Sequence, residues 1–151
     1  MACRVDVVSD THGHLSPELL AAIDGCDLLV HAGDITSEDD WAVLCTCVPQ
    51  IKAVRGNNDY YYDYGPEVGR LNTFTYEGLR FSVAHYREDL PVGVSDVAVC
   101  GHTHRSKVIQ LGGCLVVNPG SPTFPRGGTG PTMARLFVED GRVLSSEIVR
   151  L

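Results

Sequence analysis

Two histidines one residue apart follow a short apolar run in the stretch "VCGHTHRS", residues 99–106. His102 and His104 come directly after Val97–Cys100, a run with the composition of a buried strand. Side chains at positions i and i+2 point the same way when the chain is extended. A strand end that delivers two imidazoles to one point is typical of half a metal site, so further ligands must come from elsewhere in the chain.

Acidic, amide and imidazole side chains also follow four other apolar runs. The carboxyl ends of parallel strands form the ligand sites of open α/β sheets, so side chains from several strand ends can meet there. One Asp or Asn after a strand is an ordinary turn former, but five such strand ends favour a shared site. The candidates are Asp10 and His12 in "SDTHG", Asp34 in "HAGD", Asn57 and Asp59 in "RGNND", His85 in "FSVAHY", and His102 and His104.

The mixture of donor types narrows the chemistry. Two carboxylates, one amide oxygen and four imidazoles are too many for one tetrahedral ion and suit two ions with mixed oxygen and nitrogen ligands. Asp34 follows a central strand and is the natural bridging carboxylate. Abundant histidine disfavours Mg²⁺ and Ca²⁺, and the lack of cysteine disfavours a thiolate site. Two divalent ions and two carboxylates leave a local charge of about +2, or about +1 with a bridging hydroxide, which attracts a phosphate ester.

The first third of the chain supplies three of these strand ends. It alternates strand-like apolar runs with two helices that begin at the N-cap residues Ser16 and Ser37. Gly25 and Pro49 are typical residues for ending these helices. This βαβαβ order implies parallel strands with right-handed crossovers. The three strands are expected at residues 4–9, 27–32 and 51–54.

The rest of the chain is predicted to form mostly hairpins, separated by turn signals such as Glu77-Gly78 and Asp140-Gly141. One short helix fits near residues 88–90. Two mixed sheets packed face to face, with helices outside, would cover both kinds of apolar surface. Strands are expected at residues 71–75, 79–84, 97–100, 108–111, 115–117, 134–138 and 143–149.

Size and composition predict one globular domain over residues 1–151, with 44% hydrophobic residues to form its core. The net charge of −7 and the lack of a basic run argue against a dedicated nucleic-acid surface. No apolar run reaches the length of a membrane span. Strand-like sequence begins at Arg4, so we expect no signal peptide and a cytoplasmic protein. The six cysteines are expected to be core thiols, because a chain of this size can fold without disulfides.

In chain order, D-x-H, GD, GN-x-D, an isolated histidine and GHTH resemble the motifs of the calcineurin-like metallophosphoesterase superfamily. The size, "VRGNND" and "NPGSPTFPR" are most similar to its small bacterial and archaeal phosphodiesterase branch, which is related to the retromer scaffold subunit. The resemblance implies a four-layer αββα sandwich with a two-metal centre. One ion would be held by Asp10, His12, Asp34 and His104, and the other by Asp34, Asn57, His85 and His102.

The resemblance also implies a phosphodiesterase mechanism in which a hydroxide bridging two divalent ions attacks phosphorus. Mn²⁺ is the expected ion, with Fe, Zn²⁺, Co²⁺ or Ni²⁺ as alternatives. Asn57, Asp59 and His85 are the catalytic candidates: Asn57 would donate to a phosphate oxygen, and Asp59 would orient a ligand histidine. The expected partner is a small, nucleotide-like phosphate ester. His31 is expected to pack within its strand or to support Asp34.

Three positions near these motifs are candidates for substrate contact. Asn58 stands where larger family members carry a proton-donating histidine, which predicts a preference for good leaving groups. Tyr86 replaces a family glycine after His85 and would reshape or narrow the pocket. Arg126 would pair with a distal phosphate or only anchor its loop. The run "YYYDY", residues 60–64, is either packing surface or an aromatic wall for a nucleobase or aryl ester.

A scaffold that keeps the fold and binds partner proteins is the alternative from another functional class. A pure scaffold has no need of all seven ligand groups, so their joint presence favours the enzyme. The sequence leaves open the physiological substrate, the choice between monoesters and diesters, and whether the protein forms a homo-oligomer.

Overall fold

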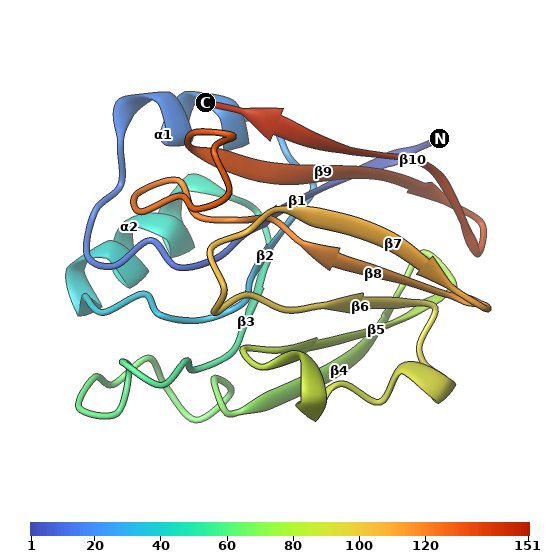
Figure 1. Cartoon of the computed structure of the whole chain (residues 1–151), viewed down its shortest axis with the longest axis horizontal. Helices are drawn as coiled ribbons and strands as arrows, with labels where there is room; N and C mark the ends of the chain where they lie inside the picture. Colours follow the sequence, from blue (N-terminus) through green and yellow to red (C-terminus); the bar gives the residue numbers. More distant parts are fainter.

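The computed structural model describes residues 1–151 as two five-stranded sheets packed face to face (Figure 1). We name them sheet A and sheet B. Sheet A consists, in spatial order, of β10 (Arg142–Arg150), β9 (Thr132–Glu139), β1 (Cys3–Val8), β2 (Leu28–His31) and β3 (Ile51–Ala53). Sheet B consists of β4 (Leu71–Tyr76), β5 (Leu79–Ala84), β6 (Val97–Val99), β8 (Cys114–Asn118) and β7 (Lys107–Leu111).

The predicted βαβαβ start is confirmed in sheet A, where β1 pairs in parallel with β2 and β2 with β3. The connecting helices are α1 (Pro17–Ile23) and α2 (Glu38–Cys47). Ser16 Oγ accepts the Leu19 N–H at 3.1 Å, and Ser37 Oγ accepts the Asp40 N–H at 3.0 Å. Each serine therefore satisfies an N–H that has no partner within the helix.

The hairpins predicted for the second half are confirmed for β4–β5, β7–β8 and β9–β10, but sheet B also contains parallel pairs that the sequence did not indicate. Its central strands β5, β6 and β8 run parallel, and only β4–β5 and β7–β8 are hairpins. The segment between β5 and β6 is long enough to cross over, and it contains the one-turn 3₁₀ helices η1 (Arg87–Asp89) and η2 (Val92–Val94). Because β5 and β6 are parallel neighbours, their carboxyl ends lie at one edge of the sheet.

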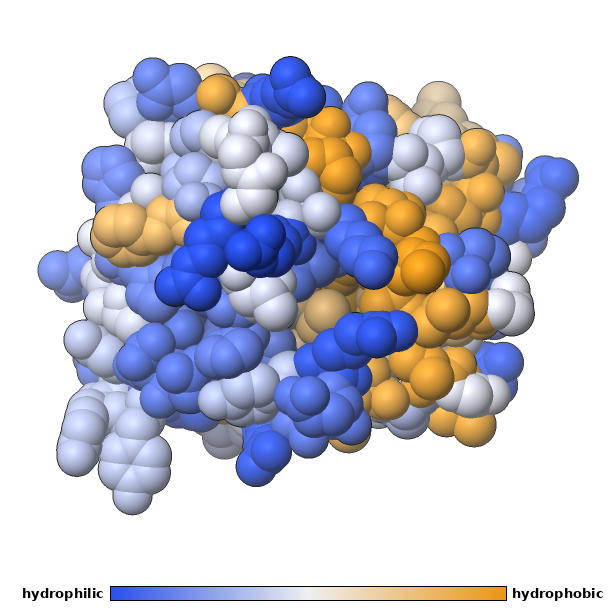
Figure 2. Space-filling model, viewed as in Figure 1, coloured by the Kyte–Doolittle hydropathy of each residue, from blue (hydrophilic) through white to orange (hydrophobic).

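The main core lies between the two sheets and includes Phe81, which stacks on Phe74 with ring centroids 5.1 Å apart. Both α-helices cover the outer face of sheet A, where Leu19 and Leu44 pack on strand residues such as Leu29. No α-helix covers the outer face of sheet B, where Leu90, at the end of η1, packs on strand residues such as Ala98. Figure 2 shows apolar side chains gathered over the strands of sheet B. No helix combines the length and apolar character required to cross a membrane.

A buried ion network joins the two ends of the chain within sheet A. The fully buried carboxylate of Asp6 on β1 accepts from Arg4 at 2.9 Å and from Arg135 on β9 at 2.9 Å. Both guanidinium groups also donate to the Ala22 carbonyl in α1, at 3.0 and 2.7 Å. This network fixes α1 against the pair of strands that carries the first site loop.

We expect Asp6→Ala to lower the free energy of unfolding by about 3 kcal/mol, because two guanidinium groups would lose their carboxylate. Urea unfolding monitored by circular dichroism measures this change. Glu67→Ala removes an exposed acid from the segment between β3 and β4, away from this network, and is the matched control. A loss for Asp6→Ala as small as that of the control would contradict a structural role for the network.

Candidate metal centre

The five strand ends identified in the sequence converge at one edge of the molecule. Asp10 and Asp34 follow β1 and β2 of sheet A, and His85 and His104 follow β5 and β6 of sheet B. Asp10 Oδ1 lies 3.2 Å from His104 Nε2, and Asp34 Oδ2 lies 3.4 Å from His85 Nε2. Two carboxylates from one sheet therefore meet imidazoles from the other, as the positions after parallel strands predict.

The imidazoles form two pairs with the carboxylates between them. His12 Nε2 and His104 Nε2 are 3.3 Å apart, as are His102 Nδ1 and His85 Nε2. Asp34 Oδ2 contacts one histidine of each pair, at 3.6 Å from His12 and 3.4 Å from His85. Two clusters have the geometry to hold an ion, and both include Asp10: Asp10, His12 and His104, and Asp10, Asp34 and His85.

The outward nitrogens of two histidines fix the direction of their inward lone pairs. His85 Nδ1 donates to the Ala32 carbonyl at 2.8 Å, and His104 Nδ1 donates to the Phe124 carbonyl at 2.7 Å. A proton on Nδ1 leaves Nε2 of each neutral ring as a free lone pair directed at the carboxylates. A backbone carbonyl on the outer nitrogen is the usual support of a metal-binding histidine.

One oxygen of Asp10 shows that these residues fit a cation. Asp10 Oδ2 accepts from Ser9 Oγ at 2.6 Å and from the His102 N–H at 3.0 Å. Asp10 Oδ1 is buried, has no hydrogen-bond partner, and faces the histidines. A buried carboxylate oxygen without a partner is costly, whereas a cation between it and the imidazole lone pairs satisfies both.

The pKa shifts follow from the same contacts. Burial would raise the pKa of Asp10, but the nearby imidazoles of His12 and His85 lower it below its ordinary value. Burial likewise opposes the ionised form of Asp34, but the His85 imidazole and the hydrogen bonds from Asn58 outweigh it, so its pKa is lowered. The carboxylates in turn raise the pKa of His12 and of His85, although burial of His85 acts in the opposite direction. Since a divalent ion must displace these protons, its affinity should rise with pH.

Backbone strain is concentrated at the ligand candidates. Eight residues other than glycine have positive φ, a conformation that side chains with a Cβ rarely adopt. Five of the eight are predicted ligands, so the strain coincides with the site and is typical of a preorganised centre. They are Asp10, His12, Asp34, His102 and His104, with φ between 48° and 71°.

Gly33, Gly56 and Gly101 allow the strand ends to approach one another. A Cβ on Gly101 would collide with Ser9 Oγ and lie 2.6 Å from Asp10 Oδ2. A Cβ on Gly33 would lie 2.7 Å from the Gly56 nitrogen and 2.9 Å from His85 Nδ1. Glycine next to Asp34, Asn57 and His102 in the motifs is the sequence signal that could have indicated this close approach.

The expectation that Asp59 orients a ligand histidine is wrong. The fully buried carboxylate of Asp59 accepts the N–H groups of Asp34 at 2.7 Å, Thr36 at 2.9 Å and Gly56 at 2.8 Å. It also accepts from the Tyr64 hydroxyl at 2.7 Å. None of its hydrogen bonds is to a ligand histidine, so it holds the backbone that presents Asp34.

The two asparagines beside the site differ in their contacts. Asn57 is exposed, its side chain makes no hydrogen bond within the chain, and it lines a polar cleft of 500 Å³ together with His12 and Asp34. Asn58 donates its backbone N–H to Asp34 Oδ1 and its amide group to Asp34 Oδ2, both at 2.9 Å. Asn57 is therefore free to bind a ligand, while Asn58 holds the carboxylate of Asp34 in place.

Arg126 lines this cleft, and Tyr86 lies against two of the imidazoles beside it. The Tyr86 ring packs against His102, with centroids 4.6 Å apart, and against His85 at 5.4 Å. The Arg126 N–H donates to the His104 carbonyl at 2.9 Å, while its side chain lines the cleft. The backbone of Arg126 therefore anchors its loop while its side chain faces the cleft, so the two roles predicted for it, loop anchor and phosphate contact, are compatible.

The two ends of the tyrosine run, residues 60–64, match different predictions: one packs inside the protein and the other is an exposed aromatic surface. Tyr64 is buried, stacks on Tyr62 with centroids 6.2 Å apart, and donates to Asp59. Tyr60 is 82% exposed and lines a second pocket of 480 Å³ with Asn57 and Tyr86. The buried end of the run supports the site loop, and the exposed end supplies an aromatic wall.

The loop after β8 has a supporting role that sequence reasoning missed. Ser121 Oγ donates to the Asp10 carbonyl and Thr123 Oγ1 to the Thr11 carbonyl, both at 2.8 Å. Asn118 Nδ2 donates to the Gly101 carbonyl at 3.1 Å. The segment "NPGSPT" therefore ties the loops after β1 and β6 together, and its pairs of partners are too distant in sequence for spacing to reveal them.

Comparison with known proteins agrees with this geometry. Residues 3–141 match the calcineurin-like phosphoesterase superfamily domain. A protein named "Probable metallophosphoesterase" from Methanothermobacter thermautotrophicus is 34% identical over 163 residues, spanning 97% of this chain and 91% of the relative. A solved structure described as a novel archaeal phosphodiesterase is 23% identical, with a TM-score of 0.78 over 97% of this chain and 99% of that one. Vacuolar Protein Sorting 29 from Cryptosporidium parvum has a TM-score of 0.75 at 18% identity, over 99% of each chain.

We expect Gly101→Ala to fold but to bind Mn²⁺ at least about tenfold more weakly, because the new methyl group displaces Ser9 and the Asp10 carboxylate. Elemental analysis after equilibration with Mn²⁺ measures bound metal, and thermal unfolding checks the fold. Gly113→Ala is the matched control, since nothing lies within 4 Å of a Cβ at that position. Equal metal content in the two variants would show that the close approach has no role.

His31 supports the turn before Asp34 as a neutral ring. Its Nδ1 accepts the Gly33 N–H at 3.1 Å, and its Nε2 lies 3.0 Å from Thr11 Oγ1. A proton on Nδ1 would face that N–H, and burial of the ring lowers the pKa of His31 to about 4. The contribution of the neutral His31 ring to the free energy of unfolding is therefore fully present above the pKa of the unfolded state, near 6.5. It is lost as the pH falls toward 4.

We expect metal-free His31→Leu to be less stable than the wild type at pH 7, where two hydrogen bonds are lost. The difference between the two proteins should narrow by on the order of 3 kcal/mol between pH 7 and pH 4, because only the wild type must protonate this ring on unfolding. Urea unfolding at both pH values measures the difference. A gap that stays constant with pH would refute the neutral buried ring.

Proposed function

This chain belongs to the calcineurin-like phosphoesterase superfamily, and from that premise we propose that it is a phosphodiesterase that works with two divalent metal ions. The superfamily is one of metal-dependent phosphoesterases, and curated relatives carry phosphoesterase and phosphodiesterase names. The observation that carries the proposal is the unpartnered Oδ1 of Asp10, directed at three imidazoles in a buried position.

The proposed ligands follow the two imidazole pairs. When bound, two divalent ions supply Lewis acidity and a water molecule whose pKa is lowered toward ~7. Mn²⁺ is our choice, and Fe, Zn²⁺, Co²⁺ and Ni²⁺ also suit mixed oxygen and nitrogen donors. The residues for one ion are Asp10, His12, Asp34 and His104, and those for the other are Asp34, Asn57, His85 and His102.

The surrounding residues hold these groups in a fixed arrangement. Carbonyl groups orient His85 and His104, and Asn58 holds both oxygens of Asp34. The free amide of Asn57 can donate to a phosphate oxygen in the cleft. Because the Asn58 amide is engaged by Asp34 and carries no acidic proton, we propose that protonation of the leaving oxygen comes from water, which favours good leaving groups.

The scaffold alternative rests on the fold that this chain shares with Vacuolar Protein Sorting 29. At 18% identity that likeness concerns the fold alone. Strained ligand positions and an unpartnered buried carboxylate are costs that a scaffold does not need. We therefore favour the enzyme, and bound metal in the purified protein is the discriminating observation.

We expect the protein with Mn²⁺ to hydrolyse bis(p-nitrophenyl) phosphate, and Asp34→Asn to lower kcat at least about hundredfold, because the carboxylate between the imidazole pairs is lost. Release of p-nitrophenol measures the rate. Asp39→Asn, in the exposed first turn of α2, is the control. Activity that survives chelation, or that Asp34→Asn leaves intact, would refute the mechanism.

A further inference from the structure

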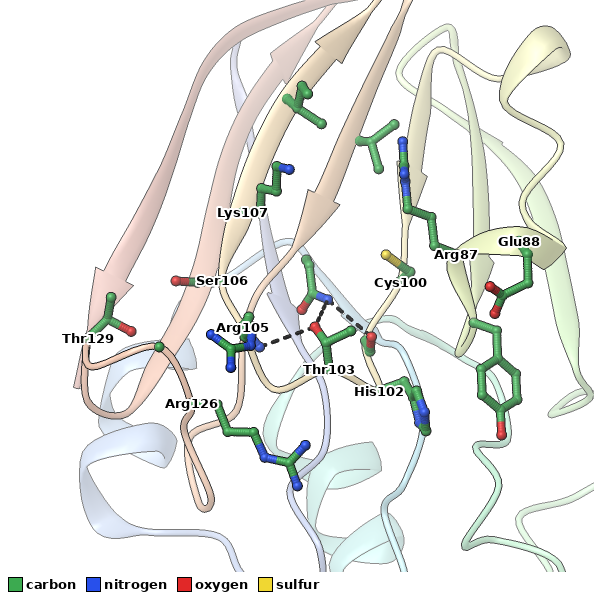
Figure 3. Close-up of a pocket in the computed structure, with 16 residues that line it drawn as sticks. Arg87, Glu88, Cys100, His102, Thr103, Arg105, Ser106, Lys107, Arg126 and Thr129 are labelled. Carbon is green, nitrogen blue, oxygen red and sulfur yellow. Dashed lines mark hydrogen bonds between the residues drawn. The ribbon is translucent and has the colours of Figure 1, made fainter.

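A further pocket, distinct from the one lined by Tyr60, opens beside the cleft and shares lining residues with it. It has a volume of 570 Å³ and is lined by residues of strands β7 and β8 of sheet B and of the loop that follows β6 (Figure 3). His102, Thr103, Arg105 and Arg126 line both the pocket and the cleft. A single substrate molecule could therefore place one group in this pocket and a phosphate at the candidate metal centre.

Four cationic side chains line this pocket, and we call it the basic pocket for these residues: Arg87, Arg105, Lys107 and Arg126. Glu88 is the one acid in its lining. Figure 3 shows Arg87 on one side of the pocket and Arg105 and Lys107 on the other, with Cys100 between them. In a chain of net charge −7, such a concentration of positive charge is local and creates an attractive field for an anion.

The four cations make no ion pair, whereas four of the other eight cationic side chains in the protein do. Arg4, Arg70, Arg80 and Arg135 each pair with an aspartate elsewhere. Arg55 donates to three backbone carbonyls instead. Unpaired cations grouped around a concave surface have free donors for an anionic ligand, and an arginine fork suits the geometry of phosphate.

We propose that the basic pocket binds a second phosphate group of the substrate, so the preferred substrate is a phosphodiester that carries a further phosphate on one of its arms. This inference rests on the proposed function. The apolar base formed by Cys100, Ile109 and Val116 would contact the carbon skeleton between the two phosphates. Water adds to the diester phosphorus, the bond to the leaving oxygen breaks, and that oxygen takes a proton, while the second phosphate is unchanged.

A pair of substrates that differ by one phosphate tests this inference. We expect the Mn²⁺ protein to cleave thymidine 5′-(p-nitrophenyl phosphate) at least about tenfold less efficiently, as kcat/KM, than the same ester with a 3′-phosphate. The double variant Arg87→Gln/Lys107→Gln should bring this ratio close to one. Arg142→Gln, at the first residue of β10 and next to the β4–β5 turn, should keep the wild-type ratio. A wild-type ratio near one, or a ratio that the double variant retains, would overturn the inference.

Binding to the metal-free protein separates this inference from the proposed function. We expect pyrophosphate to bind the protein freed of metal by dialysis, and to bind at least about tenfold more weakly to the double variant, as measured by calorimetry. If neither ester is cleaved but pyrophosphate binds in this way, the proposed function fails and the anion pocket stands. If both esters are cleaved equally, the phosphodiesterase stands and the pocket assignment fails. Absence of pyrophosphate binding to the wild type also counts against the pocket.

Discussion

Two buried carboxylates determine how the rest of this structure is arranged. Asp10 is fully buried and Asp34 is 2% exposed, and both pKa values are lowered, so both groups are ionised where water cannot solvate them. Such charges need positive partners, and the chain surrounds them with four imidazoles, two of which, His85 and His104, donate Nδ1–H to a backbone carbonyl. The carboxylates raise the pKa of His12 and of His85, which shows that they favour positive charge on these rings, and divalent ions would supply such charge more fully.

The fold meets this requirement through parallel strands in both sheets. Sheet A delivers the carboxylates and sheet B delivers most imidazoles, because the carboxyl ends of their parallel strands face the same edge. Close approach there depends on Gly101 and Gly33, which lack a Cβ where one would collide. Asp59 and Ser121 then fix the backbone below. The strained φ values are maintained by these contacts rather than by local preference.

Much of this arrangement could be predicted from the sequence, because apolar periodicity and polar strand ends are local signals. The βαβαβ start and its Ser16 and Ser37 caps follow from local rules. The parallel pairing of β5 with β6 could not be foreseen, since a crossover made of two 3₁₀ turns looks like a loop between hairpins. The true contacts of Asp59 were missed for a related reason: they are made to backbone N–H groups, which carry no sequence signature.

The cleft and its two neighbouring pockets give the metal centre a chemical context. An aromatic wall with Tyr60 lies on one side, and the unpaired cations of the basic pocket lie on the other. Tyr86 lines both pockets and contacts two of the imidazoles, so it lies where the two surfaces meet. Substrate choice in this chain would then depend on side chains outside the ligand set.

Anomalous scattering from a crystal grown with Mn²⁺ tests the central claim most directly. The account predicts two manganese peaks about 3.5–4 Å apart, one beside Asp10 and His104 and the other beside His85 and His102, with Asp34 between them. A crystal with Mn²⁺ in excess that shows no peak at Asp10 Oδ1, or a single peak away from the imidazoles, would contradict it.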